Sequence, residues 1–177
     1  MKKHFKLVAV FAFVLVATII LTGCEPKRTD VTFKGEEGTI TFAVKEDSGC
    51  KISTDEKDLR TSREQGSLVC KNFKIGIEFS DDYGYFFNSD FKKLKEARSD
   101  YDDMKEVTYS GNKAIQYFYG GYNSTEILMP VKNNDKYLID LSVYGKQDTE
   151  ESGKAAIKSE EVQDVLNNIT VLKAKAK

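Results

Sequence analysis

The chain has 177 residues, and its 27 basic residues against 28 acidic ones give a formal net charge of −1. This balance argues against a nucleic-acid-binding protein, which needs a basic face. The only histidine is His4, and there is no tryptophan. Beyond His4 the chain therefore has no imidazole for a Ser-His-Asp or Cys-His nucleophile, for a His-ligated zinc or for a proton switch near neutral pH. We expect no cofactor and no bound metal.

The N-terminal segment has three lysines in its first six residues and continues as an uncharged, largely apolar run over residues 7–21. Thr22 and Gly23 then stand directly before Cys24. A positive start, an apolar run and a small-residue cleavage site are typical of a secretory signal peptide. One alternative is an uncleaved transmembrane helix, although residues 7–23 only reach the lower limit of about 17 residues for crossing a bilayer. Another is an ordinary cleaved signal.

The ending Leu21-Thr22-Gly23-Cys24 resembles the lipobox of bacterial lipoproteins. In that family a diacylglyceryl group is attached to the cysteine thiol, and the chain is cut so that this cysteine becomes the first residue. The resemblance implies cleavage between Gly23 and Cys24, lipidation of Cys24, and a location on the extracytoplasmic side of the cell membrane. Two acyl chains hold a protein stably, whereas one chain holds it only marginally.

Residues 24–34 are predicted to form a short tether and a first short strand, and residues 35–177 a single domain. Two further cysteines, Cys50 and Cys70, fall in this domain. An extracytoplasmic location permits a disulfide between them, and closing a loop of about 20 residues stabilises a fold by roughly 3 kcal/mol. The alternative is a pair of unbonded cysteines, because a disulfide requires Cα atoms within about 7 Å.

Six segments show the period-two alternation of a strand with one buried face and one wetter face, which is typical of antiparallel sheets. They are residues 39–45, 69–80, 105–109, 113–119, 125–131 and 137–143. The last four follow one another across short, turn-rich breaks, so we expect them to form a meander. Pro130 cannot donate a ladder hydrogen bond and should lie at a sheet edge or at a strand end.

Two helices are predicted from apolar residues at helical spacing. The first covers residues 90–101, with Ser89 as its N-cap and Phe91, Leu94, Arg98 and Tyr101 on one face. The second covers residues 160–168, with Ser159 as its N-cap and two acidic residues that complement the positive end of the helix dipole.

The order of strands, helix, four-strand meander and helix predicts an α+β fold, in which helices pack on an antiparallel sheet. The segments that define this order are residues 89–101, 136–141 and 162–169. Their arrangement resembles the PsbP-like fold, found in the extrinsic photosystem subunit of that name and in many bacterial lipoproteins. The resemblance covers residues 35–172 and implies a fold without implying a chemistry.

Aromatic residues cluster in two places, around the segment 82–88 and around the turn 120–123. If the domain has a binding surface, these two loops are the candidates, because binding residues favour loops on a rigid scaffold and tyrosine joins an apolar ring to a polar tip. The candidate residues are Tyr83, Tyr85, Tyr119 and Tyr122. The alternative is that these tyrosines are core and ordinary surface residues, since aromatic residues are common in strands.

These features predict a lipid-anchored, extracytoplasmic module of the bacterial cell envelope that is not an enzyme. Its partners would be the membrane, through the diacylglyceryl anchor, and an envelope protein or a glycan, with no nucleic acid. One alternative is a histidine-free hydrolase, which needs two carboxylates facing each other across a pocket. Another is a lipoprotein that binds a small ligand, and a cavity of several hundred Å³ would favour it.

Overall fold

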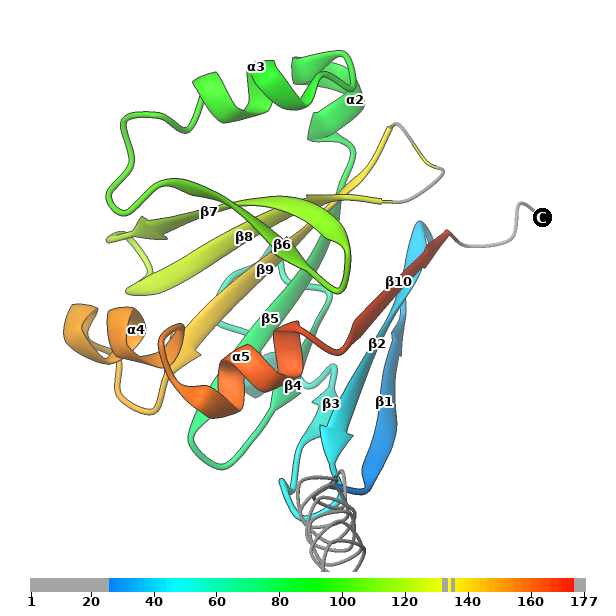
Figure 1. Cartoon of the computed structure of the whole chain (residues 1–177), viewed down its shortest axis with the longest axis vertical. Coiled ribbons are helices and arrows are strands. Elements are labelled where there is room, and N and C mark those ends of the chain that lie inside the picture. The colour runs from blue at the N-terminus through cyan, green and yellow to red at the C-terminus, as the bar shows by residue number, and fades with distance from the viewer. Residues whose placement is uncertain (1–25, 132–133, 135, 174–177) are drawn as a thin grey trace, which may run out of the picture.

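The computed structural model describes residues 26–131, 134 and 136–173, which form a mixed α+β fold with two antiparallel sheets (Figure 1). The smaller sheet has the order β1 (Arg28–Lys34), β2 (Gly38–Lys45) and β10 (Ile169–Lys173). The larger sheet has the order β3 (Lys51–Ser53), β4 (Gly66–Val69), β5 (Phe73–Ser80), β9 (Leu138–Gly145), β8 (Ser124–Pro130), β7 (Asn112–Tyr119) and β6 (Lys105–Tyr109). The α+β class predicted from the sequence is therefore confirmed.

Four α-helices lie on the two faces of the larger sheet (Figure 1): α2 (Asp82–Phe87), α3 (Phe91–Glu96), α4 (Glu150–Ala156) and α5 (Glu160–Leu166). A short 3-10 helix, η1 (Glu56–Asp58), precedes β4. One face of the larger sheet packs against α4, α5 and the smaller sheet, and we call it the inner face. The opposite face lies toward α2 and α3, and we call it the outer face.

Each face has its own apolar cluster. On the inner face, Ile77 and Leu141 are fully buried together with Phe42 of the smaller sheet and Leu166 of α5. On the outer face, a smaller cluster joins the helices to the sheet, and its buried members are Tyr83, Leu94, Ile115, Tyr117, Leu128 and Leu138. Because helices also cover part of the outer face, a charged side chain there, such as Glu126, can be buried.

The predicted meander is confirmed. Strands β6, β7, β8 and β9 are neighbours in chain order, each antiparallel to the next. The turn between β6 and β7 has positive φ angles at Ser110 (48°) and Gly111 (76°), which match the twist that tight hairpins need. Pro130 is the last residue of β8, at the strand end expected for a residue without a backbone N–H.

The two predicted helices are present but shorter. Helix α5 begins as predicted, with the Ser159 side chain accepting a hydrogen bond from the Val162 N–H, but it ends at Leu166 rather than at residue 168. Helix α3 has Asp90 as its N-cap, because that side chain accepts from the Lys92 N–H, whereas Ser89 has a positive φ of 59° just outside the helix. After Glu96 the chain continues as tight turns, with backbone bonds three residues apart, instead of extending the helix to residue 101.

Several elements differ from the sequence-based expectation. Val69 does not continue into β5 but ends β4, because the chain turns back at residues 70–72 and the Cys70 N–H donates to the Phe73 carbonyl at 3.0 Å. Strand β1 covers residues 28–34 of the segment predicted as a short tether and a first short strand, and it pairs along its whole length with β2. Helix α4 was not predicted, because the glycine at its centre, Gly153, has a low helix propensity. In the structure this position has no room for a side chain, since a Cβ would lie 2.1 Å from the Asn123 carbonyl oxygen.

Candidate functional site

Three strands of the larger sheet place a carboxylate on the outer face. The alternation that buries the apolar residues of β5, β8 and β9 on the inner face turns Glu78, Glu126 and Asp140 outward. Glu78 lies directly opposite Asp140 of the central strand β9. Glu126 lies on the diagonal from Asp140, because Asp140 pairs with Leu128 and Glu126 with Ser142. Direct and diagonal cross-strand neighbours are within reach of one another, so the sheet gathers three acidic side chains that are distant in sequence.

These carboxylates line a pocket of about 180 Å³ on the outer face. Its other charged and aromatic walls come from the turns after α3, from β7, from the turn that follows β7 and from the segment before β4. We call it the carboxylate–tyrosine pocket, and its defining residues are Glu78, Glu126, Asp140, Arg63, Arg98, Tyr101, Tyr117, Tyr119 and Tyr122.

Glu126 is held firmly at the base of the pocket. Its side chain is buried, with 5% of its surface exposed. The Ser124 hydroxyl donates to Oε1, and the Ser142 hydroxyl donates to Oε2 at 2.7 Å. Both oxygens of a buried carboxylate are thus satisfied from neighbouring strand positions, as buried polar groups require.

Asp140 lies in a very different electrostatic environment. Burial raises the pKa of the Asp140 carboxyl well above its usual range, and the charges of Glu126 and Glu78 raise it further, while Arg63 lowers it. The Asp140 side chain is within hydrogen-bonding reach of Glu126. The carboxyl therefore holds a proton above the pH at which an ordinary aspartate loses it, and it can donate that proton to Glu126.

The pocket also contains hydrogen-bonding capacity that the fold leaves unused. Among the described residues, three buried side-chain nitrogen or oxygen atoms have no hydrogen-bond partner, and two of them belong to this lining: Asp140 Oδ1 and Arg98 Nε. A buried polar atom without a partner costs roughly 1–3 kcal/mol. This pocket therefore contains one buried acceptor and one buried donor that each carry this cost. A ligand that hydrogen-bonds them would explain why both are present in one lining.

Arg63 balances part of the acidic charge. Its Nε and Nη2 atoms donate to Glu78 Oε1 at 3.1 and 3.0 Å, and Nη2 lies 3.6 Å from Asp82 Oδ2 of α2. Burial raises the pKa of Glu78, whereas the charge and hydrogen bond of Arg63 lower it. With Arg98 as a second cation in the lining, the pocket has only a small net charge.

Four tyrosines line the pocket beside the carboxylates, and Tyr117 of β7 is the direct cross-strand neighbour of Glu126. The ring centroids of Tyr101 and Tyr117 are 4.7 Å apart, and those of Tyr119 and Tyr122 are 5.2 Å apart. Tyr101 and Tyr122 are 38% and 45% exposed, so these rings face both the pocket and the solvent. The guanidinium carbon of Arg98 lies 5.9 Å from the ring centroids of both Tyr101 and Tyr117, within cation–π range.

The four tyrosines predicted as a binding surface do not all belong to this pocket. Tyr119 and Tyr122 line it. Tyr85 is 79% exposed on α2 and is not part of the lining. The prediction is wrong for Tyr83, which is only 6% exposed, because the segment 82–88 forms helix α2 and turns one side onto the sheet.

The remaining predicted residues lie elsewhere. A disulfide joins Cys50 and Cys70, whose Cα atoms are 4.2 Å apart. The predicted cleavage and lipidation residues, Gly23 and Cys24, fall outside the described residues. Within residues 26–131, 134 and 136–173, no helix has the length and apolarity to cross a membrane, and no group of three or more histidine, cysteine or acidic side chains is arranged to hold a metal ion.

Sequence reasoning did not identify Glu78, Glu126, Asp140 and Arg98 as one site. The available signal was an acidic residue at an outward position of three predicted strands, together with an arginine on the apolar face of a predicted helix. Comparisons of this chain with protein-family models, with curated proteins and with solved structures gave no match. The site therefore has to be interpreted from its own chemistry.

Proposed function

We propose that this protein is a lipid-anchored, extracytoplasmic binding module of the bacterial cell envelope, and that its carboxylate–tyrosine pocket binds one sugar unit of an envelope glycan. The observation that supports this most is the pair of unpartnered buried atoms, Asp140 Oδ1 and Arg98 Nε, in one lining. Neither atom is accessible to solvent, so binding requires a shift of one or both side chains. Hydrogen bonds from the ligand to both atoms would then offset the free-energy cost of that shift.

The chemistry of the lining favours a neutral, hydroxyl-rich ligand. A hydroxyl group is both a donor and an acceptor, so sugar hydroxyls can satisfy the acceptor on Asp140 and the donor on Arg98. The exposed rings of Tyr101 and Tyr122 offer apolar faces with polar tips, which suit a sugar ring. The volume of about 180 Å³ is below the range of about 300–1,000 Å³ for sites that enclose a whole small molecule. We infer that one unit enters and that the rest of the glycan lies outside.

The anchor would orient the pocket away from the membrane. A chain spans at most about 3.6 Å per residue, so the few residues between Cys24 and Arg28 keep the start of β1 within about 15 Å of a lipid on Cys24. The start of β1 and the α2–α3 segment lie at opposite ends of the molecule (Figure 1). The outer-face pocket beneath α2 and α3 would therefore be presented to the envelope rather than to the lipid.

The binding proposal is tested by saturation-transfer NMR and calorimetry with glucose, galactose and N-acetylglucosamine as probes. We expect one of these sugars to bind, and we expect Tyr122→Ala and Arg98→Gln to weaken that binding about tenfold or more, the loss of about 1.4 kcal/mol. Tyr85→Ala is the matched control, because Tyr85 is an exposed tyrosine outside the lining. Equal affinity in Tyr122→Ala and Tyr85→Ala, or no binding of any probe, would contradict the proposal.

The anchor is tested separately by growing the expressing bacteria with an alkyne analogue of palmitate. We expect the wild-type chain to incorporate the label and Cys24→Ala to lose it. The double variant Cys50→Ala/Cys70→Ala controls for labelling at other cysteines and should keep the label. Labelling that persists in Cys24→Ala would rule out the lipidation proposed at this residue.

We also propose that the domain has a PsbP-like fold. The helix at residues 91–96, the meander β6–β9 and the closing helix α5 support this assignment, because they follow the element order on which the resemblance rests. The assignment carries no chemistry, since one fold hosts many functions.

A histidine-free hydrolase is the second candidate, because Asp140 and Glu126 combine a protonated and a hydrogen-bonded carboxyl in one pocket. Because Asp140 is within hydrogen-bonding reach of Glu126, the pair does not match a glycosidase, whose two carboxyl groups stand roughly 5–9.5 Å apart on either side of the bond that is cut. Assays with nitrophenyl glycosides and with a peptide pool decide between the candidates. Turnover that Asp140→Asn abolishes would favour the hydrolase over the binding module.

A further inference from the structure

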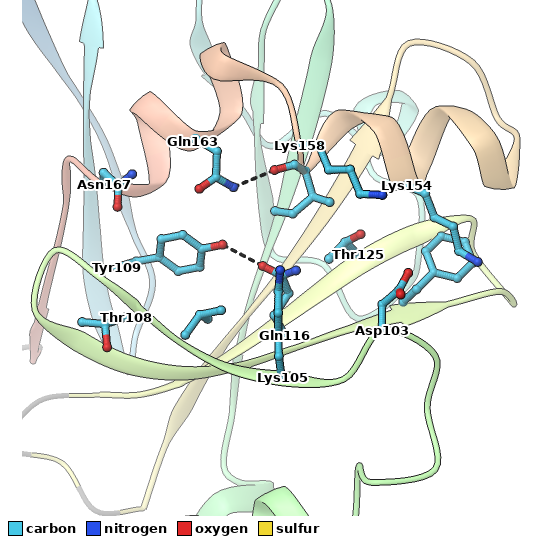
Figure 2. A pocket seen from close by; sticks show the side chains of 13 residues that line it. Asp103, Lys105, Thr108, Tyr109, Gln116, Thr125, Lys154, Lys158, Gln163 and Asn167 are labelled. Carbon is cyan, nitrogen blue, oxygen red and sulfur yellow. Dashed lines mark hydrogen bonds between the residues drawn. The ribbon is translucent and has the colours of Figure 1, made fainter.

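A second cavity lies on the inner face, on the other side of the larger sheet from the carboxylate–tyrosine pocket. It has a volume of about 540 Å³ and is enclosed by β6, β7 and β8 on one side and by the α4–α5 segment on the other (Figure 2). This volume is within the range of about 300–1,000 Å³ for small-molecule sites. Nothing in the proposed glycan binding uses it.

The floor of this cavity is polar where the rest of the inner face is apolar. Tyr109 of β6, Gln116 of β7 and Thr125 of β8 occupy inward positions and are only 4%, 4% and 3% exposed. Inward positions nearby hold Ala114 and Ile127, both fully buried. Three buried polar residues on adjacent strands are costly unless they are hydrogen-bonded. Their grouping at the cavity therefore indicates a polar surface suited to a ligand rather than part of the ordinary apolar core.

The hydrogen bonds within the floor leave donors facing the cavity. The Tyr109 hydroxyl donates to Gln116 Oε1 at 2.7 Å, as Figure 2 shows. That bond fixes the oxygen of the Gln116 amide and leaves its NH₂ group as a donor for a ligand. On the helix side, Gln163 Nε2 donates to the Ile157 carbonyl at 2.6 Å, which holds this side chain at the cavity wall.

The rim is basic. Lys105 lies on the sheet side of the cavity, and Lys154 and Lys158 lie on the helix side (Figure 2). Lys154 is paired with Glu150 at 2.7 Å and with Asp102 at 3.9 Å, whereas Lys105 and Lys158 have no ion pair with any residue that the structure describes. The acidic side chain in the lining is Asp103. Two lysines without an ion pair among the described residues, Lys105 and Lys158, against one aspartate make this rim positive on a chain whose net charge is −1.

We propose that this cavity, which we call the lysine pocket, binds a small organic anion through a carboxylate or phosphate group. The anionic group would accept hydrogen bonds from Lys105, Lys158 and the Gln116 amide, because ammonium and amide N–H groups are the donors that such oxygens need. The proposal is independent of the glycan site, since the two pockets lie on opposite faces of one sheet and share none of these residues.

The test is an NMR titration of the full domain with inorganic phosphate and with succinate, at constant ionic strength maintained with sodium chloride. We expect saturable shifts at Gln116, and about tenfold weaker binding, a loss of about 1.4 kcal/mol, in Lys105→Gln/Lys158→Gln. The matched control is Lys92→Gln/Lys93→Gln, which removes the same charge from the exposed side of α3. Gln116→Met tests the amide donor without adding a charge.

The two probes distinguish the two anionic groups, because saturation by only one of them identifies which group the pocket prefers. Shifts that do not saturate with either probe would overturn the proposal. Equal weakening in both lysine double variants would also overturn it, because the effect would then reflect net charge rather than the pocket. Neither result would bear on sugar binding at the outer face, so the two proposals fail separately.

Discussion

Replacing Asp140 with asparagine tests the electrostatics of the carboxylate–tyrosine pocket through protein stability. An asparagine is neutral at every pH and keeps an N–H donor toward Glu126, so it imitates the protonated carboxyl. In the wild type, burial raises the pKa of Asp140 in the folded state, whereas the unfolded chain has the ordinary aspartate pKa of about 3.9. Between these two pKa values the folded protein binds more protons than the unfolded chain, so the free energy of unfolding decreases as the pH rises.

The size of the effect follows from that linkage. Each pH unit between the unfolded and folded pKa values costs the wild type about 1.4 kcal/mol of stability, because only the folded state holds the proton there. Asp140→Asn does not show this decrease in the free energy of unfolding, because asparagine binds no proton in either state. We therefore expect the stability of Asp140→Asn relative to wild type to increase from pH 4 upward and to level off once the pH exceeds the folded pKa.

Urea unfolding between pH 3 and pH 8, followed by circular dichroism, measures the difference. Asp164→Asn is a control of opposite sign, because Arg28 hydrogen-bonds Asp164 at 2.6 and 3.1 Å and lowers its pKa. That variant should lose about 1 kcal/mol near neutral pH, and the loss should shrink as the pH falls. A stability difference for Asp140→Asn that does not change with pH would refute the protonated state of Asp140.

Three further predictions concern stability. Replacing Cys50 and Cys70 with serine should cost about 3 kcal/mol, because the disulfide closes a sequence separation of 20 residues, and a reductant should lower the melting temperature of the wild type but not of the double serine variant. Tyr144→Phe should cost about 1–3 kcal/mol in urea unfolding, because it removes the 2.6 Å hydrogen bond to the buried Glu64 carboxylate, and a loss near zero would mean that water replaces that donor. Gly76→Ala should cost about 1–3 kcal/mol by the same measurement, because its Cβ would lie 2.5 Å from Glu64 Cδ, and an unchanged stability would show that Glu64 moves aside freely.

The parts of the fold that the sequence predicted well are those that depend on neighbours along the chain. The meander β6–β9 follows from period-two alternation and from turn residues such as Gly111, and both signals are local. The start of α5 follows from a Ser159 hydroxyl placed three residues before an N–H that needs a partner. Helix α4 was missed because glycine lowers the local helix propensity, whereas in the structure the absence of a Cβ at Gly153 permits a close tertiary approach to Asn123.

The sequence by itself determined that the chain lacks imidazole after His4, that its strands pair mainly with their neighbours, and that Tyr119 and Tyr122 follow one another around a turn. Only the tertiary structure decided that Glu78, Glu126 and Asp140 face one pocket, because strand order and register set cross-strand contacts between residues far apart in sequence. The same holds for the raised pKa of Asp140, since desolvation depends on what covers a side chain rather than on its sequence neighbours. Burial likewise decided that Tyr83 is core and Tyr85 is surface, although the two are only two residues apart.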